Sequence, residues 1–118
     1  MIMSTAPEQA IVVFMTAANS EEAGRLADML LSKRLAACVQ ILPEMESVFR
    51  WQGKIERQRE ILLIAKTVSS KFAELEREVV ALHSYETPEI VAFPLTRGYG
   101  PYLEWLSAIV AEQDQENS

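Results

Sequence analysis

The hydrophobic and polar positions change their spacing several times along the chain, and each change predicts a new element. Residues 11–15 form an unbroken apolar run rich in β-branched side chains, which is typical of a buried central strand. A helix is predicted from Asn19 to about residue 34, because Asn19 can cap it and Glu22 completes a capping-box pattern. The apolar positions of this helix recur at helical spacing: Ala23, Leu26, Ala27, Leu30 and Leu31.

Two long strands joined by a tight turn are predicted next. Residues 36–51 have the pattern of one strand, which Pro43 interrupts; proline cannot donate to a ladder and therefore marks a bulge or an edge. Gln52 and Gly53 predict a two-residue turn in which glycine supplies the positive φ. Residues 54–67 predict the return strand, polar at first and then aliphatic. Together these features predict a long β-hairpin.

The rest of the chain predicts a second helix, a short strand and a last helix. Ser69 or Ser70 is expected to cap the second helix. The apolar face of that helix carries Phe72, Leu75, Val79 and Leu82. The later predicted elements are a loop at 83–88, a strand at 89–95, whose Pro94 argues for an edge, and a helix at 101–112. Because crossover connections between strands are right-handed, few sheet topologies are compatible with this order of strands and helices. We therefore expect an α+β fold: a ferredoxin-like βαββαβ antiparallel sheet with a long hairpin and an extra C-terminal helix.

The predicted hairpin is longer than the helices that accompany it. A strand of about sixteen residues spans roughly 50 Å, whereas a helix of about fifteen residues covers only roughly 22 Å. The overhanging part carries Val48, Phe49, Trp51 and Ile55. A lone two-stranded ribbon is marginally stable in water. Another copy of the same chain is the simplest cover for it, so the pattern favours a homo-oligomer.

Length and composition predict one domain across residues 1–118. The chain has 118 residues, of which 49% are apolar, so it can bury a core without a disulfide or a structural metal. The core is expected within about residues 11–112. The polar segments 1–9 and 113–118 are expected to be loose ends.

The net charge and the cysteine content limit the classes of partner and the cellular compartment that we expect for this chain. The net charge of −6 repels a phosphate backbone, so nucleic acid is not an expected partner, whereas cations are natural guests. No apolar stretch is long enough for a spanning helix, and the N-terminus lacks the features of a signal peptide, so no membrane association is expected. The single cysteine, Cys38, fits a reducing cytoplasm.

Five stretches form a specific pattern in a fixed order along the chain. They are RLAACV at 34–39, FRWQGKIE at 49–56, ILLIAKT at 61–67, LHSYETPEIV at 82–91 and YLEWL at 102–106. Over about residues 11–110 the chain resembles the CutA divalent-cation-tolerance family. The resemblance implies a ferredoxin-like fold, a tight homotrimer, and a link to tolerance of copper and similar divalent ions.

The resemblance also points to candidate metal ligands. It implies a cysteine at the end of the first strand and histidines at the end of the second helix. In this chain Met15 stands at the first place, and His83, the only histidine, stands at the second and is followed by Ser84 where the family usually has proline. The metal candidates are thus His83, Met15, whose thioether suits Cu(I), and Cys38.

Each candidate also has a structural interpretation. His83 can serve as a C-terminal cap of the second helix or as an exposed imidazole that captures copper. Cys38 and Met15 can simply be apolar core residues. A second set of residues is expected in a cleft or interface between subunits: Trp51, Phe49, Lys66, Tyr85, Glu89 and Glu60. Lys66 is expected either to pair with Glu60 or Glu89 or to face solvent.

The pattern does not favour an enzyme. One histidine and one cysteine 45 positions apart give no nucleophile–base motif, and the 15–19 segment has neither the two cysteines of a copper chaperone nor the arginine of an acylphosphatase loop. We expect a cytoplasmic homotrimer that needs no cofactor, confers divalent-cation tolerance, and binds copper through His83 with an affinity no better than micromolar. The alternative is a small-molecule-sensing trimer like the PII signalling proteins, although the short turn at Gln52 replaces their long loop.

Overall fold

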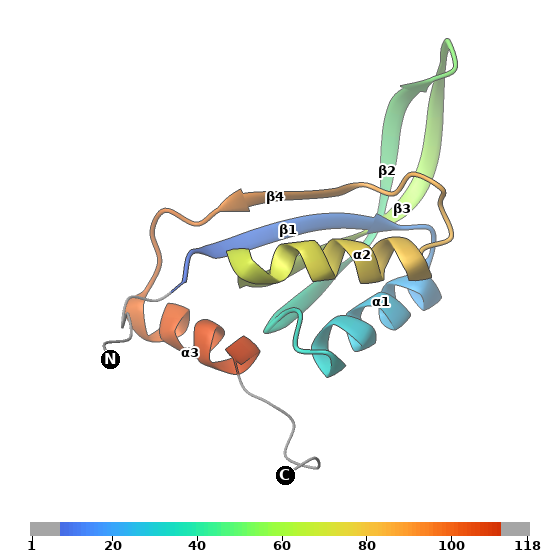
Figure 1. Cartoon of the computed structure of the whole chain (residues 1–118). Coiled ribbons are helices and arrows are strands. Elements are labelled where there is room, and N and C mark those ends of the chain that lie inside the picture. The colour runs from blue at the N-terminus through green and yellow to red at the C-terminus, as the bar shows by residue number, and fades with distance from the viewer. Residues whose placement is uncertain (1–7, 112–118) are drawn as a thin grey trace.

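The computed structural model describes residues 8–111, which form one four-stranded antiparallel sheet and three α-helices (Figure 1). The elements are β1 (Ala10–Ala17), α1 (Ser20–Ser32), β2 (Cys38–Trp51), β3 (Lys54–Val68), a 3₁₀ turn (Ser69–Lys71), α2 (Phe72–Leu82), β4 (Ile90–Pro94) and α3 (Gly100–Ala111). The strand order β2-β3-β1-β4 is that of a ferredoxin-like sheet. The predicted fold class is therefore confirmed, with its long hairpin and its extra C-terminal helix.

The main core lies between the sheet and the pair of helices α1 and α2, which run along one face of it (Figure 1). Alternate residues of β1 point to these helices, and Val13 and Met15 are completely buried. They pack with Leu63 of β3 and with Leu26 and Leu30 of α1. The continuous apolar run in β1 thus reflects a central strand, which pairs with β3 on one side and β4 on the other.

A second, smaller cluster fixes α3 against the end of the sheet. Leu106 and Val110 of α3 pack with Ala37 and Val68, where β2 begins and β3 ends. The guanidinium of Arg34 also donates a hydrogen bond to the carbonyl of Ile109, at 3.2 Å. The C-terminal helix is therefore part of the folded unit.

The hairpin of β2 and β3 bends away from the helices and projects beyond them (Figure 1). The pairing register shifts between Leu42 and Met45, so Pro43 lies at a bulge in an edge strand, as predicted. At the tip, φ is +80° at Gly53 and also +51° at Gln52. Two positive φ angles are the signature of a type I′ turn, the two-residue turn that matches strand twist.

The face of the sheet opposite α1 and α2 is apolar and partly exposed. We call it the open face; its rows of paired residues contribute Val12, Phe14, Leu42, Leu62, Ile64, Val91 and Phe93. Phe14 packs edge-on against Phe93, with ring centroids 5.3 Å apart. Val91 and Phe93 nevertheless remain about half exposed, at 50% and 45%. A single chain thus leaves apolar surface uncovered on this side.

Three local predictions are wrong. Neither Ser69 nor Ser70 caps α2, because both lie in the 3₁₀ turn before it, and the Ser70 hydroxyl instead donates to Glu8. Leu82 is 42% exposed and does not join the buried face of its helix. Gln9, which was expected in a loose end, is held in place, because its side chain donates to the carbonyl of Leu95 at 2.9 Å. The remaining predicted loose ends, 1–7 and 113–118, and the predicted last helical residue 112 lie outside the described residues.

Candidate functional site

A buried carboxylate connects the start of α1 to the segment that follows α2. Asn19 caps α1 by accepting a hydrogen bond from the Glu22 amide at 2.8 Å, as the capping pattern predicted. The Glu22 side chain is only 2% exposed. It accepts hydrogen bonds from the backbone amide of Ala18 at 2.9 Å and from the amide of Ser84 at 2.6 Å. Glu22 thereby anchors the 83–89 segment to the β1–α1 loop.

The hydrogen bonds keep this carboxylate ionised despite its burial. Burial raises the pKa of Glu22, but the amides of Ala18 and Ser84 and the Ser84 hydroxyl together outweigh it, so that the pKa lies below its ordinary value. Sequence patterns indicated only a capping role for Glu22. Its bond to Ser84 joins residues 62 positions apart, and no local signal indicates it.

His83 is buried beside Glu22, and both of its ring nitrogens are engaged. Nε2 lies 2.7 Å from the carbonyl oxygen of Thr16, and Nδ1 lies 3.0 Å from the amide nitrogen of Tyr85. A carbonyl only accepts and an amide only donates, so these two contacts place a proton on Nε2 and use Nδ1 as an acceptor; Nδ1 also lies 3.6 Å from the Glu22 carboxylate. His83 is the C-cap residue of α2, as the first interpretation predicted, and its side chain has no exposed surface, so the alternative of an exposed imidazole is wrong.

The three candidate metal ligands do not converge. Met15 is fully buried on the helix-covered face of the sheet. Cys38 is partly exposed and pairs with Lys66, whose partner on β1 is Val12, so its side chain lies on the open face. Within residues 8–111, no three histidine, cysteine, aspartate or glutamate side chains are grouped to hold a metal ion.

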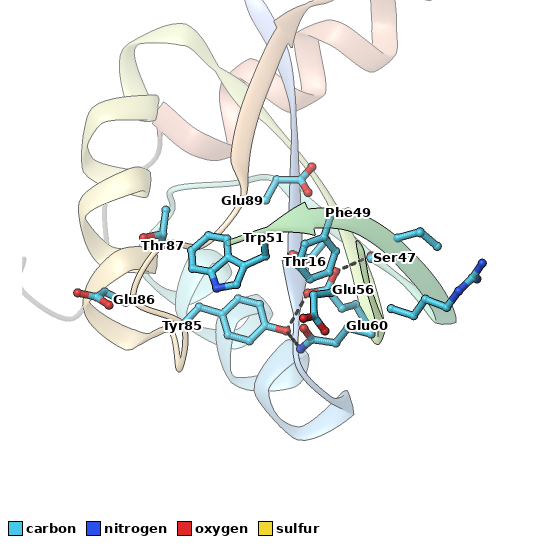
Figure 2. Close-up of a pocket in the computed structure, with 13 residues that line it drawn as sticks. Thr16, Ser47, Phe49, Trp51, Glu56, Glu60, Tyr85, Glu86, Thr87 and Glu89 are labelled. Atoms are coloured by element: carbon cyan, nitrogen blue, oxygen red, sulfur yellow. Dashed lines mark hydrogen bonds between the residues drawn. The ribbon is translucent and has the colours of Figure 1, made fainter. Parts of the chain in front are cut away.

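A polar network holds the segment after α2 against the hairpin. The Tyr85 hydroxyl donates to Glu60 at 2.7 Å and accepts from the Gln58 amide at 2.6 Å, and Ser47 donates to the other oxygen of Glu60 at 2.6 Å (Figure 2). Burial raises the pKa of the Tyr85 phenol, and the neighbouring carboxylate of Glu60 raises it further. Tyr85 therefore stays a hydrogen-bond donor over the physiological pH range.

These contacts border the hairpin cleft, a hollow of about 850 Å³ between the β2–β3 hairpin and residues 85–89 (Figure 2). Five of the six residues expected in a cleft line it: Trp51, Phe49, Tyr85, Glu89 and Glu60. Lys66 lies elsewhere, with its ammonium 5.6 Å from the centroid of the Tyr102 ring. The sharing of this cleft between subunits stays a prediction. Sequence reasoning did not anticipate Thr16, Ser47 or Gln58 in its lining.

The fold and the hairpin cleft define a small α+β protein of ferredoxin-like architecture. Residues 11–109 match the family described as CutA1 divalent ion tolerance protein. The chain is 50% identical over 98 residues to the divalent-cation tolerance protein CutA of Archaeoglobus fulgidus, a match that covers 83% of this chain and 95% of that relative. The chain therefore belongs to the CutA1 divalent ion tolerance family.

Solved structures agree with this assignment. Rice CutA1 superposes with a TM-score of 0.87 at 43% identity, covering 91% of this chain and 98% of that one. The A. fulgidus structure, described as a periplasmic divalent cation tolerance protein, superposes with a TM-score of 0.83 at 48% identity, covering 86% and 98% of the two chains. Of the described helices, none is long and apolar enough to cross a membrane.

Proposed function

We propose that this chain acts in divalent-cation tolerance as a homotrimer. The exposed apolar side chains of the open face and of the projecting hairpin support the assembly of several copies. Trp51 and Ile55 at the hairpin tip are 55% and 67% exposed, and Phe93 on the open face is 45% exposed. Removal of this apolar surface from water by a partner stabilises an assembly. Identical chains commonly form such an assembly with closed cyclic symmetry. Family membership favours three copies.

Sedimentation equilibrium tests the assembly directly. The expected mass is three times the 13.3 kDa of one chain at micromolar concentration. A monomer at that concentration would refute the trimer. A dimer would still agree with the burial of exposed apolar surface by a second copy, but it would reject a threefold assembly.

We propose that divalent cations, copper among them, bind this trimer only weakly. The net charge of −6 attracts cations. Copper prefers imidazole and sulfur ligands, but His83 can offer a lone pair only by giving up its bond with Thr16 or Tyr85. That cost supports an affinity no better than micromolar.

Calorimetry with copper on the wild type and on His83→Ala tests this proposal. A lower affinity in the variant would support His83 as a ligand, and unchanged binding would remove it from the site. Cys38→Ser is the matched control, because it removes the only thiol in the sequence and so tests whether Cys38 contributes to copper binding. Nanomolar affinity in the wild type would reject weak binding. A melting scan adds a second readout, because copper that extracts His83 from its buried position would lower the melting temperature.

A small-molecule-sensing trimer is the second candidate function, and the hairpin cleft favours it. Its volume of about 850 Å³ lies within the range of ligand sites. We infer binding without turnover, because neither His83 nor Cys38 lines the cleft. Hydrolysis of a phosphate or ester substrate that is lost in His83→Ala would overturn that inference. We also propose a cytoplasmic location on the basis of the single cysteine, which cell fractionation can test.

A further inference from the structure

The β2–β3 hairpin leaves the sheet at a point where strand pairing is interrupted. The register of β2 against β3 shifts between Leu42 and Met45, and Pro43 within this step has no amide hydrogen to donate. Beyond the step lies the outer hairpin, residues 44–60, in which β2 and β3 pair only with each other. A two-stranded ribbon is marginally stable by itself. Backbone pairing alone therefore does not fix the angle between the outer hairpin and the sheet.

Tyr85 connects the outer hairpin to the rest of the chain. Its hydroxyl donates to Glu60 at 2.7 Å and accepts from the Gln58 side chain at 2.6 Å (Figure 2). Within residues 8–111, the side-chain hydrogen bonds that join the outer hairpin to the other elements both end on this hydroxyl, since Ser47, Arg57 and Arg59 bond within the hairpin. The connection is thus concentrated on one phenol.

Glu60 lies where this connection acts on both strands of the hairpin. It pairs with Met45, the first paired residue of β2 after the register shift, and it is only 7% exposed. Its second carboxylate oxygen accepts a hydrogen bond from Ser47 of β2 at 2.6 Å. Hydrogen bonds to a carboxylate are stronger than those between neutral groups, and more so where water is excluded. One carboxylate therefore joins β2, β3 and Tyr85 directly beside the bend.

The backbone at Tyr85 is itself fixed to the core. Its amide donates to Nδ1 of His83 at 3.0 Å, and the two rings pack with centroids 4.8 Å apart. Nε2 of His83 bonds the carbonyl of Thr16 on β1, and the amide of Ser84 donates to the buried carboxylate of Glu22 on α1. Tyr85 is therefore held at both ends, by the core and by the outer hairpin.

We propose that Tyr85 is a positioning residue, which sets the angle at which the outer hairpin leaves the sheet and so holds the hairpin in the orientation used for assembly. Without the hydroxyl, the outer hairpin would move about the bulge at Pro43, and each copy would have to order it on association, at a cost in conformational entropy. The role in assembly rests on the proposed homotrimer, whereas the positioning of the hairpin does not.

Hydrogen exchange measured by mass spectrometry on the assembled protein tests the positioning. Tyr85→Phe removes the hydroxyl and retains the ring. We expect amides in residues 44–60 to exchange about tenfold faster, while those of β1 keep the wild-type rate. Unchanged exchange in the outer hairpin would overturn the proposal. Equal acceleration in β1 would show a general loss of stability and would also overturn it.

Two further variants control this measurement. Gln58→Met retains the length of the side chain and removes its donor, so it should accelerate exchange in the outer hairpin by a smaller factor than Tyr85→Phe. Tyr99→Phe is the matched control, because Tyr99 is 77% exposed and its hydroxyl bonds no described residue, and it should leave exchange unchanged. Faster exchange of the outer hairpin in Tyr99→Phe would reject the assignment to Tyr85.

Exchange of subunits between isotopically labelled and unlabelled protein, followed by native mass spectrometry, tests the role in assembly. We expect subunits of Tyr85→Phe to exchange about tenfold faster than those of the wild type, because the contact between copies loses a pre-oriented hairpin. A wild-type rate in Tyr85→Phe would reject this role. A wild-type protein that is monomeric would reject the homotrimer instead, and the hydrogen exchange of the outer hairpin would still decide the positioning.

Discussion

The helix-covered face of the sheet and the hairpin contain similar apolar side chains, but only the first buries them within one chain. Leu30 of α1 and Leu63 of β3 have no exposed surface, whereas Trp51 and Ile55 of the hairpin are 55% and 67% exposed. The difference follows from length, since β2 and β3 continue past the ends of both helices (Figure 1).

This contrast divides the molecule into a part that determines its fold and a part that remains available to partners. Burial in the core stabilises the chain by roughly 25 cal/mol for each Å² of apolar surface. The same surface on the hairpin contributes only when another molecule covers it. Mutations in the two regions should therefore affect different measurements.

The largest effect is expected in the core. Leu30→Ala should lower the free energy of unfolding by about 3 kcal/mol, because it removes a completely buried side chain and leaves a cavity. Urea denaturation measures the change. Leu31→Ala is the matched control on the same helix, since Leu31 is 44% exposed, and it should cost well below 1 kcal/mol. Equal losses in the two variants would contradict the burial assigned to α1.

A smaller effect is expected for assembly. Trp51→Ala should weaken the trimer by about 2 kcal/mol, since buried tryptophans are frequent anchors of interfaces. Sedimentation equilibrium over a range of concentrations measures it. Trp51→Phe should show only part of the loss, because it retains a ring. If Trp51→Ala left the association unchanged, the hairpin tip would not belong to the interface.

Glu22 tests how the 83–89 segment, which contacts the hairpin through Tyr85, is attached to the start of α1 in the core. Glu22→Gln should cost about 1–3 kcal/mol, because charge-assisted hydrogen bonds to Ala18 and Ser84 are weakened. The lowered pKa means that the ionised carboxylate stabilises the fold above its ordinary pKa of 4.5, and that this contribution is lost as the pH falls through the lowered folded-state value.

Stability measured between neutral pH and pH 3 in the wild type and in Glu22→Gln checks this assignment. The variant should lose less stability on acidification. Glu78→Gln is the control, because the ammonium of Lys33 also lowers the pKa of Glu78 but does so on the protein surface. A pH profile in Glu22→Gln that matches the wild type would reject the role of the carboxylate.

The smallest effect is spectroscopic. The raised pKa of Tyr85 predicts that its phenol ionises after that of an ordinary tyrosine, whose pKa is 10.0. Stability from this group is complete below that pH and is lost as the pH rises through the folded-state value. Ultraviolet titration of the wild type and of Tyr85→Phe should show the variant lacking only the latest-ionising component. Loss of an early component instead would contradict its bond to Glu60.

The elements could be predicted from sequence because their signals are local. Periodicity identified α1, Pro43 marked the bulge, and Gly53 marked the turn. The uncovered hairpin also followed from strand and helix lengths alone. The cap of α2 was misjudged because two serines precede a 3₁₀ turn, which shifts the start of the helix.

The surroundings of His83 could not be predicted, because they depend on distant parts of the chain. Its ring meets the carbonyl of Thr16, 67 positions away, once β1 and α2 have packed together. The end of a helix normally faces solvent, so local reasoning identified the helix cap but could not show that the imidazole is buried. The cleft residues were partly predicted because Trp51 and Tyr85 stand out in the sequence, whereas Ser47 and Gln58 do not.

The position of β1 between β3 and β4 has a consequence for the rate of folding. β2 and β3 meet across two residues, so their pairing closes a short loop and can form within microseconds. β1 must find Ile64 and Val91, which are both far along the chain, before the central ladder is complete. Closing such long loops costs entropy before any contact compensates for it. We therefore expect the docking of β1 to limit the folding rate, with the hairpin already paired when it arrives.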